Sequence, residues 1–494
     1  MRVYQRFFAA RAVPSLAVLL VVASLLGCGG DDADGTWELP NGDLSGTRAA
    51  AGSPIEAGNV SKLDVRWRYR LTAKAPYSGA FASTPVADRT TVYVQDLESN
   101  VHALDRATGK ARWVHRYRAP NEGPNGVAVD SSRVYGATDS DAFALSVATG
   151  RQLWSRHLTS PTEQFVDIAP VVWRGLVFTS TIGFPPGGRG AIYALDAATG
   201  AVRWKFDTIR HPWRYPLEAG GGGLWYPVSV DAQGRLYAGT ANPAPWGGSP
   251  QRPNGAAFPG PVPYTDSLLV LDAKTGRLLW HDQVTPHDVR DYDFQATPIL
   301  ATVEGEELVL GAGKAGRVIA WDRETGRRRW TTAVGLHRND LGPLPQRRVT
   351  VCPGLLGGVV TPMAYADGRV FVPVVDLCGW GSATTRQELT SLRPAQGKGR
   401  LVALDAATGR PLWVRRLPSP DFGCATVSND VVFTSTFDGN VYAFAAADGK
   451  LVWRARMRAG VNACPAVAGD LVVFGAGAPR SGGVTPELVG FGLP

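Results

Sequence analysis

Three carboxylates and one histidine lie within ten residues in the segment TPHDVRDYDF, residues 285–294. The segment directly follows an apolar run that ends in Trp280. A carboxylate can take up a proton as a general base, and oxygen side chains are the ligands of hard cations. The competing interpretation is a loop whose acids pair with Arg290 or with water. A lone loop histidine is usually solvated, so no role is assigned to His287.

A cationic candidate, Lys314, lies in GAGKAG, residues 311–316. This segment formally satisfies the G-x-G-x-x-G fingerprint of dinucleotide-binding turns. We reject that interpretation because strands are expected on both sides, so no helix N-terminus follows to receive a pyrophosphate. Neither H-E-x-x-H nor G-x-S-x-G occurs in the sequence.

A repeat of the form A-x-D-x-x-T-G-x-x-x-W surrounds these candidates. Each copy predicts a strand, a tight turn that ends in glycine, and a second strand with a tryptophan at a fixed offset. The glycine supplies the positive φ that the turn needs. The seven tryptophans are Trp113, Trp154, Trp204, Trp280, Trp330, Trp413 and Trp453, and the seven glycines are Gly109, Gly150, Gly200, Gly276, Gly326, Gly409 and Gly449.

Two further β-rich runs precede most copies, as in TTVYVQD and DVVFTSTFDG, so each unit predicts a four-stranded propeller blade. Trp67 has no hairpin before it, and the chain after Trp453 has no tryptophan strand of its own. We therefore predict an all-β, eight-bladed β-propeller over residues 62–494, with its ring closed by the N-terminal strand. Residues 29–61 are expected to be a linker and entry segment.

Two blades are about twice as long as the shortest ones, from Trp204 to Trp280 and from Trp330 to Trp413. The excess includes Gly/Pro-rich insertions near 242–263 and 335–358. Such segments are not expected to join a ladder. We expect them to fold over one face of the ring and to shape a pocket at the central channel.

Residues 1–28 read as a lipoprotein signal. A basic stretch with three arginines precedes the apolar run 12–27, and Gly27 precedes Cys28, the expected site of acylation. An uncleaved membrane anchor is the alternative. Either arrangement makes the protein extracytoplasmic and attached to a membrane, in the periplasm or at the cell surface.

The other four cysteines predict two disulfides in an oxidising compartment. Cys424 and Cys464 stand at equivalent places in successive repeats, which leaves Cys352 to pair with Cys378. No C-x-x-C-H occurs, so no covalently attached haem is expected.

The formal net charge of +8 is spread along the repeats, and three of the arginines belong to residues 1–28. Nucleic-acid binding usually requires basic residues gathered into a stripe or patch. The sequence therefore does not predict a nucleic-acid partner.

The repeat resembles the tryptophan-docking repeat of the pyrroloquinoline quinone (PQQ) propellers. The segments NGDLSGTR, TANPAPW, TPHDVRDYD and GKAGRVIAWDRETG are similar, in the same order, to signatures of the quinoprotein alcohol dehydrogenases, which include polyvinyl-alcohol dehydrogenase-like members. The resemblance covers nearly all of the chain after residue 28. It implies PQQ as cofactor and a calcium or lanthanide ion.

The resemblance also implies roles for single residues. Trp225 matches the indole on which the quinone lies, and Lys314 matches the cation that contacts the quinone oxygens. Asp291 matches the catalytic base. Asn242, Asp291 and Asp293 match metal ligands, Asp293 being the extra carboxylate of the lanthanide-dependent members.

Several positions depart from the family pattern. Pro185 replaces a metal-binding glutamate, Asn125 replaces an arginine and Arg290 replaces a tryptophan, while Val359, Val360 and Thr361 stand where an Asn-Trp pair is expected. The family's adjacent cysteine pair is missing. Asp293 is a candidate to compensate for the lost glutamate, and Arg290 a candidate to neutralise the acids beside it.

Two functions of different classes follow. The first is a lipid-anchored dehydrogenase that oxidises an alcohol or polyol with PQQ and passes electrons to a separate acceptor such as a cytochrome. The second is a non-catalytic scaffold that binds protein partners, similar to the outer-membrane assembly lipoproteins. An enzyme-derived propeller that binds a ligand without catalysis is a third possibility. The long insertions and the acidic segment favour the first.

Overall fold

The computed structural model describes residues 35–73, 79–160, 164–209, 215–249, 251–256, 258, 260–384, 394–478 and 485–494. The expected signal and Cys28 lie outside these residues. Within them the chain forms strands and loops, with short 3-10 helices η2 (Val60–Lys62), η3 (Pro216–Glu218) and η5 (Pro394–Gln396). No helix of the described residues is long and apolar enough to cross a membrane.

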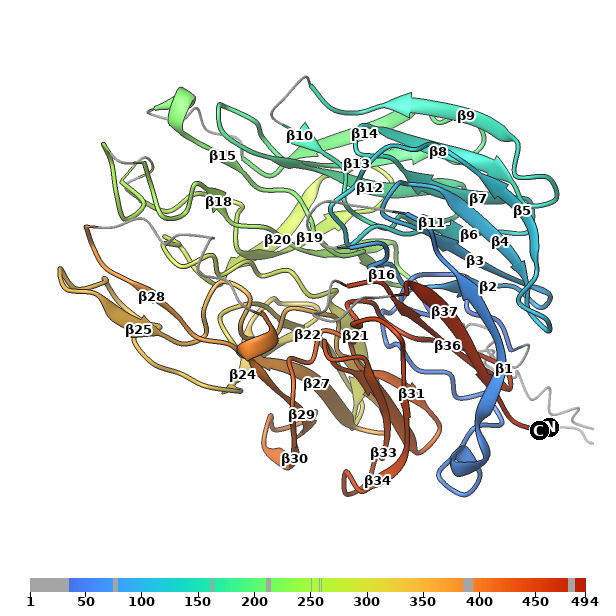
Figure 1. Ribbon diagram of the computed structural model, residues 1–494. Coiled ribbons are helices and arrows are strands. Elements are labelled where there is room, and N and C mark those ends of the chain that lie inside the picture. The colour runs from blue at the N-terminus through green and yellow to red at the C-terminus, as the bar shows by residue number, and fades with distance from the viewer. Residues whose placement is uncertain are drawn as a thin grey trace, which may run out of the picture. The chain divides into compact units, whose positions relative to one another are not determined.

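Eight four-stranded antiparallel blades confirm the predicted propeller (Figure 1). Blades one to four, each from the innermost strand outward, are β2 (Val86–Ala87), β3 (Thr91–Gln95), β4 (Val101–Asp105), β5 (Ala111–His115); β6 (Ala128–Val129), β7 (Arg133–Ala137), β8 (Asp141–Ser146), β9 (Gln152–His157); β11 (Val171–Trp173), β12 (Leu176–Gly183), β13 (Ala191–Asp196), β14 (Val202–Asp207); and β16 (Ser229–Val230), β17 (Arg235–Gly239), β19 (Ser267–Asp272), β20 (Leu278–Gln283). In the third blade, β10 (Gln164–Phe165) also pairs with the end of β12.

Blades five to eight follow the same order. They are β21 (Ile299–Val303), β22 (Glu306–Ala312), β23 (Arg317–Asp322), β24 (Arg328–Ala333); β26 (Ala364–Ala366), β27 (Arg369–Asp376), β29 (Lys398–Asp405), β30 (Pro411–Leu417); β31 (Thr426–Ser428), β32 (Val431–Ser435), β33 (Asn440–Ala445), β34 (Leu451–Arg456); and β35 (Ala466–Ala468), β36 (Leu471–Ala476), β37 (Glu487–Gly492), β1 (Asp64–Arg70). The middle strands are buried on both faces, whereas the outer strand β9 exposes every residue except Trp154.

The N-terminal strand closes the ring as predicted. β1 is the outermost strand of the eighth blade and pairs antiparallel with β37, with Trp67 opposite Gly490. Closure pairs two segments from opposite ends of the chain, so the open edge of β37 is covered by the chain itself.

Each repeat tryptophan docks on the next blade. The indole of Trp67 donates a hydrogen bond to the Arg106 carbonyl (2.8 Å), and its ring lies against Gly109. A Cβ on Gly109 would stand 2.6 Å from that ring. The repeat glycines have φ values from +67° to +73°. Glycine is therefore required for the turn and also for close approach of the tryptophan.

The entry segment, residues 37–50, crosses the inner strands of six blades. Its backbone forms hydrogen bonds of 2.7–3.0 Å with Ala87 of β2, Val129 of β6, Val230 of β16, Leu300 of β21, Tyr365 of β26 and Val427 of β31. One short peptide thus ties together blades that are far apart in the sequence.

Arg48 in this segment is fully buried, yet all its N–H groups have acceptors. The guanidinium donates to the carbonyls of Pro40, Ala425 and Pro465, to Asn41 Oδ1 and to Thr426 Oγ1 at 2.6–3.0 Å. Burial lowers the pKa of Arg48 to about 9. Since the five acceptors are neutral, the charge is held by hydrogen bonds.

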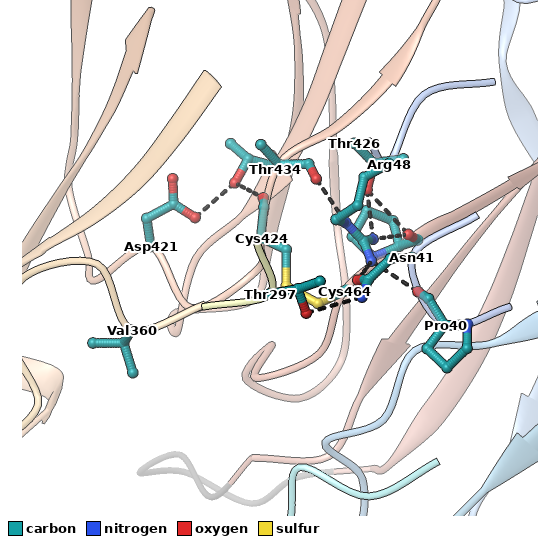
Figure 2. The surroundings of a disulfide bond; sticks show 12 residues. Pro40, Asn41, Arg48, Thr297, Val360, Asp421, Cys424, Thr426, Thr434 and Cys464 are labelled. Atoms are coloured by element: carbon teal, nitrogen blue, oxygen red, sulfur yellow. Dashed lines mark hydrogen bonds between the residues drawn. A yellow bond between two sulfur atoms is a disulfide. The ribbon is translucent and has the colours of Figure 1, made fainter. Parts of the chain in front are cut away.

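Two disulfides are present, Cys424–Cys464 and Cys352–Cys378, which are the pairs that the sequence predicts. Cys424 and Cys464 join the beginnings of the seventh and eighth blades. Figure 2 shows this bond beside Arg48 and Asn41 of the entry segment. The other disulfide joins the paired segments 349–351 and 379–381 at one end of a small sheet outside the blades.

Parts of both insertions form ladders, so the expectation that they join none is wrong. Within 242–263, β18 (Pro243–Ala244) pairs with β15 (Gly220–Gly221), and within 335–358, β25 (Val349–Val351) pairs with β28 (Gly379–Gly381). These sheets stay separate from the blades and lie at the left of Figure 1. Pro243 lacks an N–H, which suits a ladder of only two residues.

Trp67→Ala is expected to lower the free energy of unfolding by about 3–5 kcal/mol, because it leaves a cavity at the closing strand. Urea unfolding followed by circular dichroism measures this change. Val65→Ala in the same exposed strand is the control and should cost no more than about 0.5 kcal/mol. Equal losses in both variants would contradict a special role of the docked indole.

Candidate functional site

A cavity of about 730 Å³ lies among loops at the inner ends of the blades. Trp225 and Lys314 contribute one part of its wall. Leu356, Val360, Phe422 and Phe437 contribute another part, which belongs to a single apolar cluster. The cavity therefore has one side that carries Trp225 and Lys314, and an apolar side.

Lys314 joins the two aspartates of the acidic segment. Its Nζ lies 2.7 Å from Asp291 Oδ2 and 2.6 Å from Asp293 Oδ2. The side chains are 9%, 13% and 1% exposed, respectively. Loops between β20 and β21 and between β22 and β23 thus meet in one largely buried ion cluster.

Asn242 and Trp225 complete this cluster. The Asn242 side chain donates from Nδ2 to Asp291 Oδ1 (2.9 Å) and to Asp288 Oδ2 (3.3 Å), and its backbone N–H donates to Asp293 Oδ1 (2.8 Å). Trp225 Nε1 donates to the same Asp293 oxygen at 3.3 Å. The structure therefore brings together all five residues that the sequence singled out.

Asp288 is a functional residue that the sequence reading did not assign. Its Oδ1 accepts the backbone N–H of Arg290 (2.8 Å) and its Oδ2 that of Tyr292 (2.7 Å). These bonds shape the turn that places Asp291 at a φ of +66°, a region that favours glycine. The only signal in the sequence was its place among three clustered acids.

Burial dominates the electrostatics of the cluster. It raises the pKa of Asp291 to about 7, although Lys314 acts in the opposite direction. The two carboxylates outweigh the effect of burial on Lys314 and raise its pKa. The lysine therefore stays charged, and Asp291 is a group that can exchange a proton near neutral pH.

Asp266 adds an unusual fourth acid. It is fully buried, and neither carboxyl oxygen has a hydrogen-bond partner among the described residues. Burial, followed by repulsion from Asp288, Asp293 and Asp291, raises its pKa well above the ordinary range. A single aspartate before a strand gives no signal of this in the sequence.

Arg290 forms no ion pair with Asp291 or Asp293, although it attracts Asp288 electrostatically. Its guanidinium donates to the carbonyls of Asn339 (3.1 Å) and Gly342 (2.7 Å), both in the second insertion. Tyr292 donates to the Pro353 carbonyl at 3.0 Å, next to the Cys352–Cys378 disulfide. The insertion thus braces the loop that carries Asp291.

The same insertion also contacts the loop that carries Lys314. A Cβ on Gly358 would stand 2.1 Å from the Lys314 carbonyl, so the two backbones touch there. The Val359 N–H donates to the Gly313 carbonyl at 3.1 Å. Both partners of the ion pair are therefore held by the second insertion.

Three of the departing residues, Val360, Thr361 and Asn125, lie in or next to the cavity lining. Thr361 lines the cavity, and its buried Oγ1 has no partner among the described residues. Asn125 is buried and donates to the Asp96 carbonyl at 2.8 Å. Glu122 also lines the cavity, and burial raises its pKa.

The residues of the site suit the quinone that the family resemblance implies better than they suit the metal ion. An indole and a charged lysine at the cavity, with an unpartnered hydroxyl, suit a flat polar quinone. In contrast, the described residues include no group of three or more His, Cys, Asp or Glu side chains arranged to hold a metal ion. Asn242 turns its NH₂ group, not its oxygen, toward the carboxylates.

Comparison with known proteins defines the class. A model described as the β-propeller domain of glucose, ethanol and alcohol dehydrogenases matches residues 156–334, which include Trp225, Asn242, Asp291 and Lys314. A model described as outer membrane protein assembly factor BamB matches residues 56–183 and 397–486. The chain is thus similar to PQQ-type β-propeller proteins over residues 56–334 and 397–486.

Its relatives are quinoprotein alcohol dehydrogenases. The quinohemoprotein alcohol dehydrogenase of Comamonas testosteroni is 28% identical over 487 residues, which cover 83% of this chain and 67% of that enzyme. A polyvinylalcohol dehydrogenase of Sphingopyxis sp. is 25% identical over 456 residues, covering 79% of this chain and 62% of that protein.

Solved structures show the same fold. The crystal structure of the Comamonas enzyme has a TM-score of 0.80 at 24% identity and covers 93% of this chain and 80% of its own. A europium-containing methanol dehydrogenase has a TM-score of 0.76 at 20% identity, covering 93% and 98%.

Arg290→Met is expected to loosen residues 285–294, because it removes the hydrogen bonds from the guanidinium to the second insertion. Hydrogen–deuterium exchange should show at least about tenfold faster exchange in this loop and little change in the blades. Arg328→Met, which removes an exposed ion pair with Asp282, is the matched control. Unchanged exchange in the loop would show that the brace does not hold it.

Proposed function

We propose that the protein is a PQQ-dependent dehydrogenase that oxidises an alcohol or polyol in the central cavity and passes electrons to a separate acceptor such as a cytochrome. The observation that carries the proposal is the cluster formed by Lys314, Trp225, Asp291 and Asn242. Lys314 and Trp225 also line the cavity. The four residues come from four separate loops. A scaffold has no need for such a buried ion cluster beside an indole.

Each residue has a distinct task in this proposal. PQQ, when bound, supplies the two-electron oxidation of the alcohol carbon. Trp225 provides a flat apolar surface for its rings, and Lys314 supplies positive charge. Asp291 accepts the hydroxyl proton of the alcohol as general base. The apolar wall around Phe422 and Phe437 excludes water from the site.

The proposal also includes the cellular location of the protein. Disulfides form and persist in oxidising compartments, and the two in this chain support an extracytoplasmic location. The acylated Cys28 would attach the protein to a membrane. Palmitate labelling of the full chain, lost in Cys28→Ala, tests this anchor.

Asp291→Asn is expected to lower the turnover of an alcohol by about 10²–10⁴-fold, because the amide cannot accept the proton. Asp291→Asn should still bind PQQ, as measured by quenching of tryptophan fluorescence, whereas Trp225→Ala should lose PQQ binding. Glu304→Gln, at an exposed turn, is the control for charge. Full activity of Asp291→Asn would remove the catalytic assignment.

The pH dependence follows from the raised pKa of Asp291. The carboxyl is protonated below about pH 7 and works as a base only when it is ionised. We therefore expect kcat/KM to rise as pH increases through about 7, by roughly tenfold per unit on the acidic side. A profile that falls over this range would contradict the assignment of Asp291 as base.

A non-catalytic scaffold is the second candidate, favoured by the BamB match at both ends of the chain. Absence of PQQ binding under any condition would support this candidate. Binding of PQQ without oxidation of any alcohol would indicate a propeller that has kept its ligand and lost catalysis.

A further inference from the structure

The carboxylate oxygens around Lys314 are already occupied by protein donors. Asp293 Oδ1 accepts from Asn242 N–H (2.8 Å) and Trp225 Nε1 (3.3 Å), and its Oδ2 lies 2.6 Å from Lys314 Nζ. Asp291 Oδ1 accepts from Asn242 Nδ2 (2.9 Å), and its Oδ2 accepts from Lys314 Nζ (2.7 Å). No oxygen of this pair is left without a nitrogen donor.

Asp288, the third acid of the segment, is equally engaged. Its two oxygens accept the backbone N–H groups of Arg290 and Tyr292 at 2.8 and 2.7 Å. A hard cation such as Ca²⁺ needs six to eight oxygen ligands, several of them carboxylate oxygens. Here each carboxylate oxygen that such an ion could approach already accepts a hydrogen bond, and Asn242 presents its NH₂ group, not its oxygen, to them.

The ammonium of Lys314 adds a direct obstacle. A divalent or trivalent ion between Asp291 and Asp293 would compete with Lys314 Nζ for the same oxygens, and the two like charges would repel each other in a buried site. Lys314 is held in place by the contact of its backbone with Gly358 and by the hydrogen bond from its N–H to the Asp293 carbonyl (3.0 Å).

We propose that Lys314 is the permanent counter-cation of Asp291 and Asp293, so that the site binds its quinone without calcium or a lanthanide. The statement about the quinone rests on the proposed function. The statement about the metal rests only on the donors around the two aspartates.

A terbium experiment tests the metal statement without any activity. Trp225 lies against Asp293, so Tb³⁺ bound there would emit light after tryptophan excitation. The full-length wild-type protein, purified in detergent, is titrated with Tb³⁺ alone. The Lys314→Met variant, which keeps the approximate side-chain length and removes the charge, is titrated in the same way. Lys398→Met, at an exposed lysine whose Nζ donates to a backbone carbonyl, is the matched control.

We expect no saturable emission from the wild-type protein or from Lys398→Met. Lys314→Met should gain saturable emission at least about tenfold above the wild-type level, and Asp293→Asn in the same chain should abolish the gain. Saturable emission from the wild type that is lost in Asp293→Asn would overturn the proposal. A folded Lys314→Met that gains no emission would also overturn it, and Lys314→Gln replaces this variant if it does not fold.

A second titration separates this inference from the proposed function. PQQ is added to the wild-type protein in excess EDTA, in Ca²⁺ or in La³⁺, and tryptophan quenching is followed. The affinities should agree within about twofold. Binding that requires a metal would overturn the inference and keep the proposed function. No binding in any buffer would overturn the proposed function, and the terbium result would still decide the role of Lys314.

Discussion

The entry segment, residues 37–50, holds the inner strands of six blades in place around the centre of the ring. Its backbone forms hydrogen bonds with these strands. The guanidinium of Arg48 donates five hydrogen bonds to neutral acceptors from three parts of the chain. A buried guanidinium that lost these acceptors would be costly, so the surrounding loops are held in one arrangement. With the inner strands fixed in this way, the loops that carry the candidate site have rigid supports.

The site concentrates charge in a place that water barely reaches. Burying Asp291 and Asp293 requires compensation, and Lys314, Asn242 and Trp225 provide it. Asp266, in contrast, is buried without a hydrogen-bond partner among the described residues, and burial raises its pKa well above the ordinary range. The second insertion holds the parts together, since it contacts both the loop of Asp291 and the loop of Lys314.

The fold could be predicted because its determinants are local and repeated. A glycine and a tryptophan at fixed spacing specify each turn and each docking contact, and the surplus Trp67 indicates the closing strand. The meeting of Trp225, Asn242, Asp291 and Lys314 was accessible only through family resemblance. The brace by Arg290 was not predictable, because its acceptors are backbone carbonyls of Asn339 and Gly342, which have no side-chain signature. The hydrogen bonds that the carboxylates of Asp291 and Asp293 accept could not be predicted either, since they depend on how the side chains are oriented.

The closing strand has a consequence for the order in which the protein is made. β1 emerges early in synthesis, but its partner β37 lies near the other end of the chain. Until β37 appears, the apolar face around Trp67 and the unpaired edge of β1 remain open to wrong partners. Closure therefore has to wait for the last strands, and long-range pairing of this kind is slow. The propeller is thus completed by the pairing of its two most distant described strands.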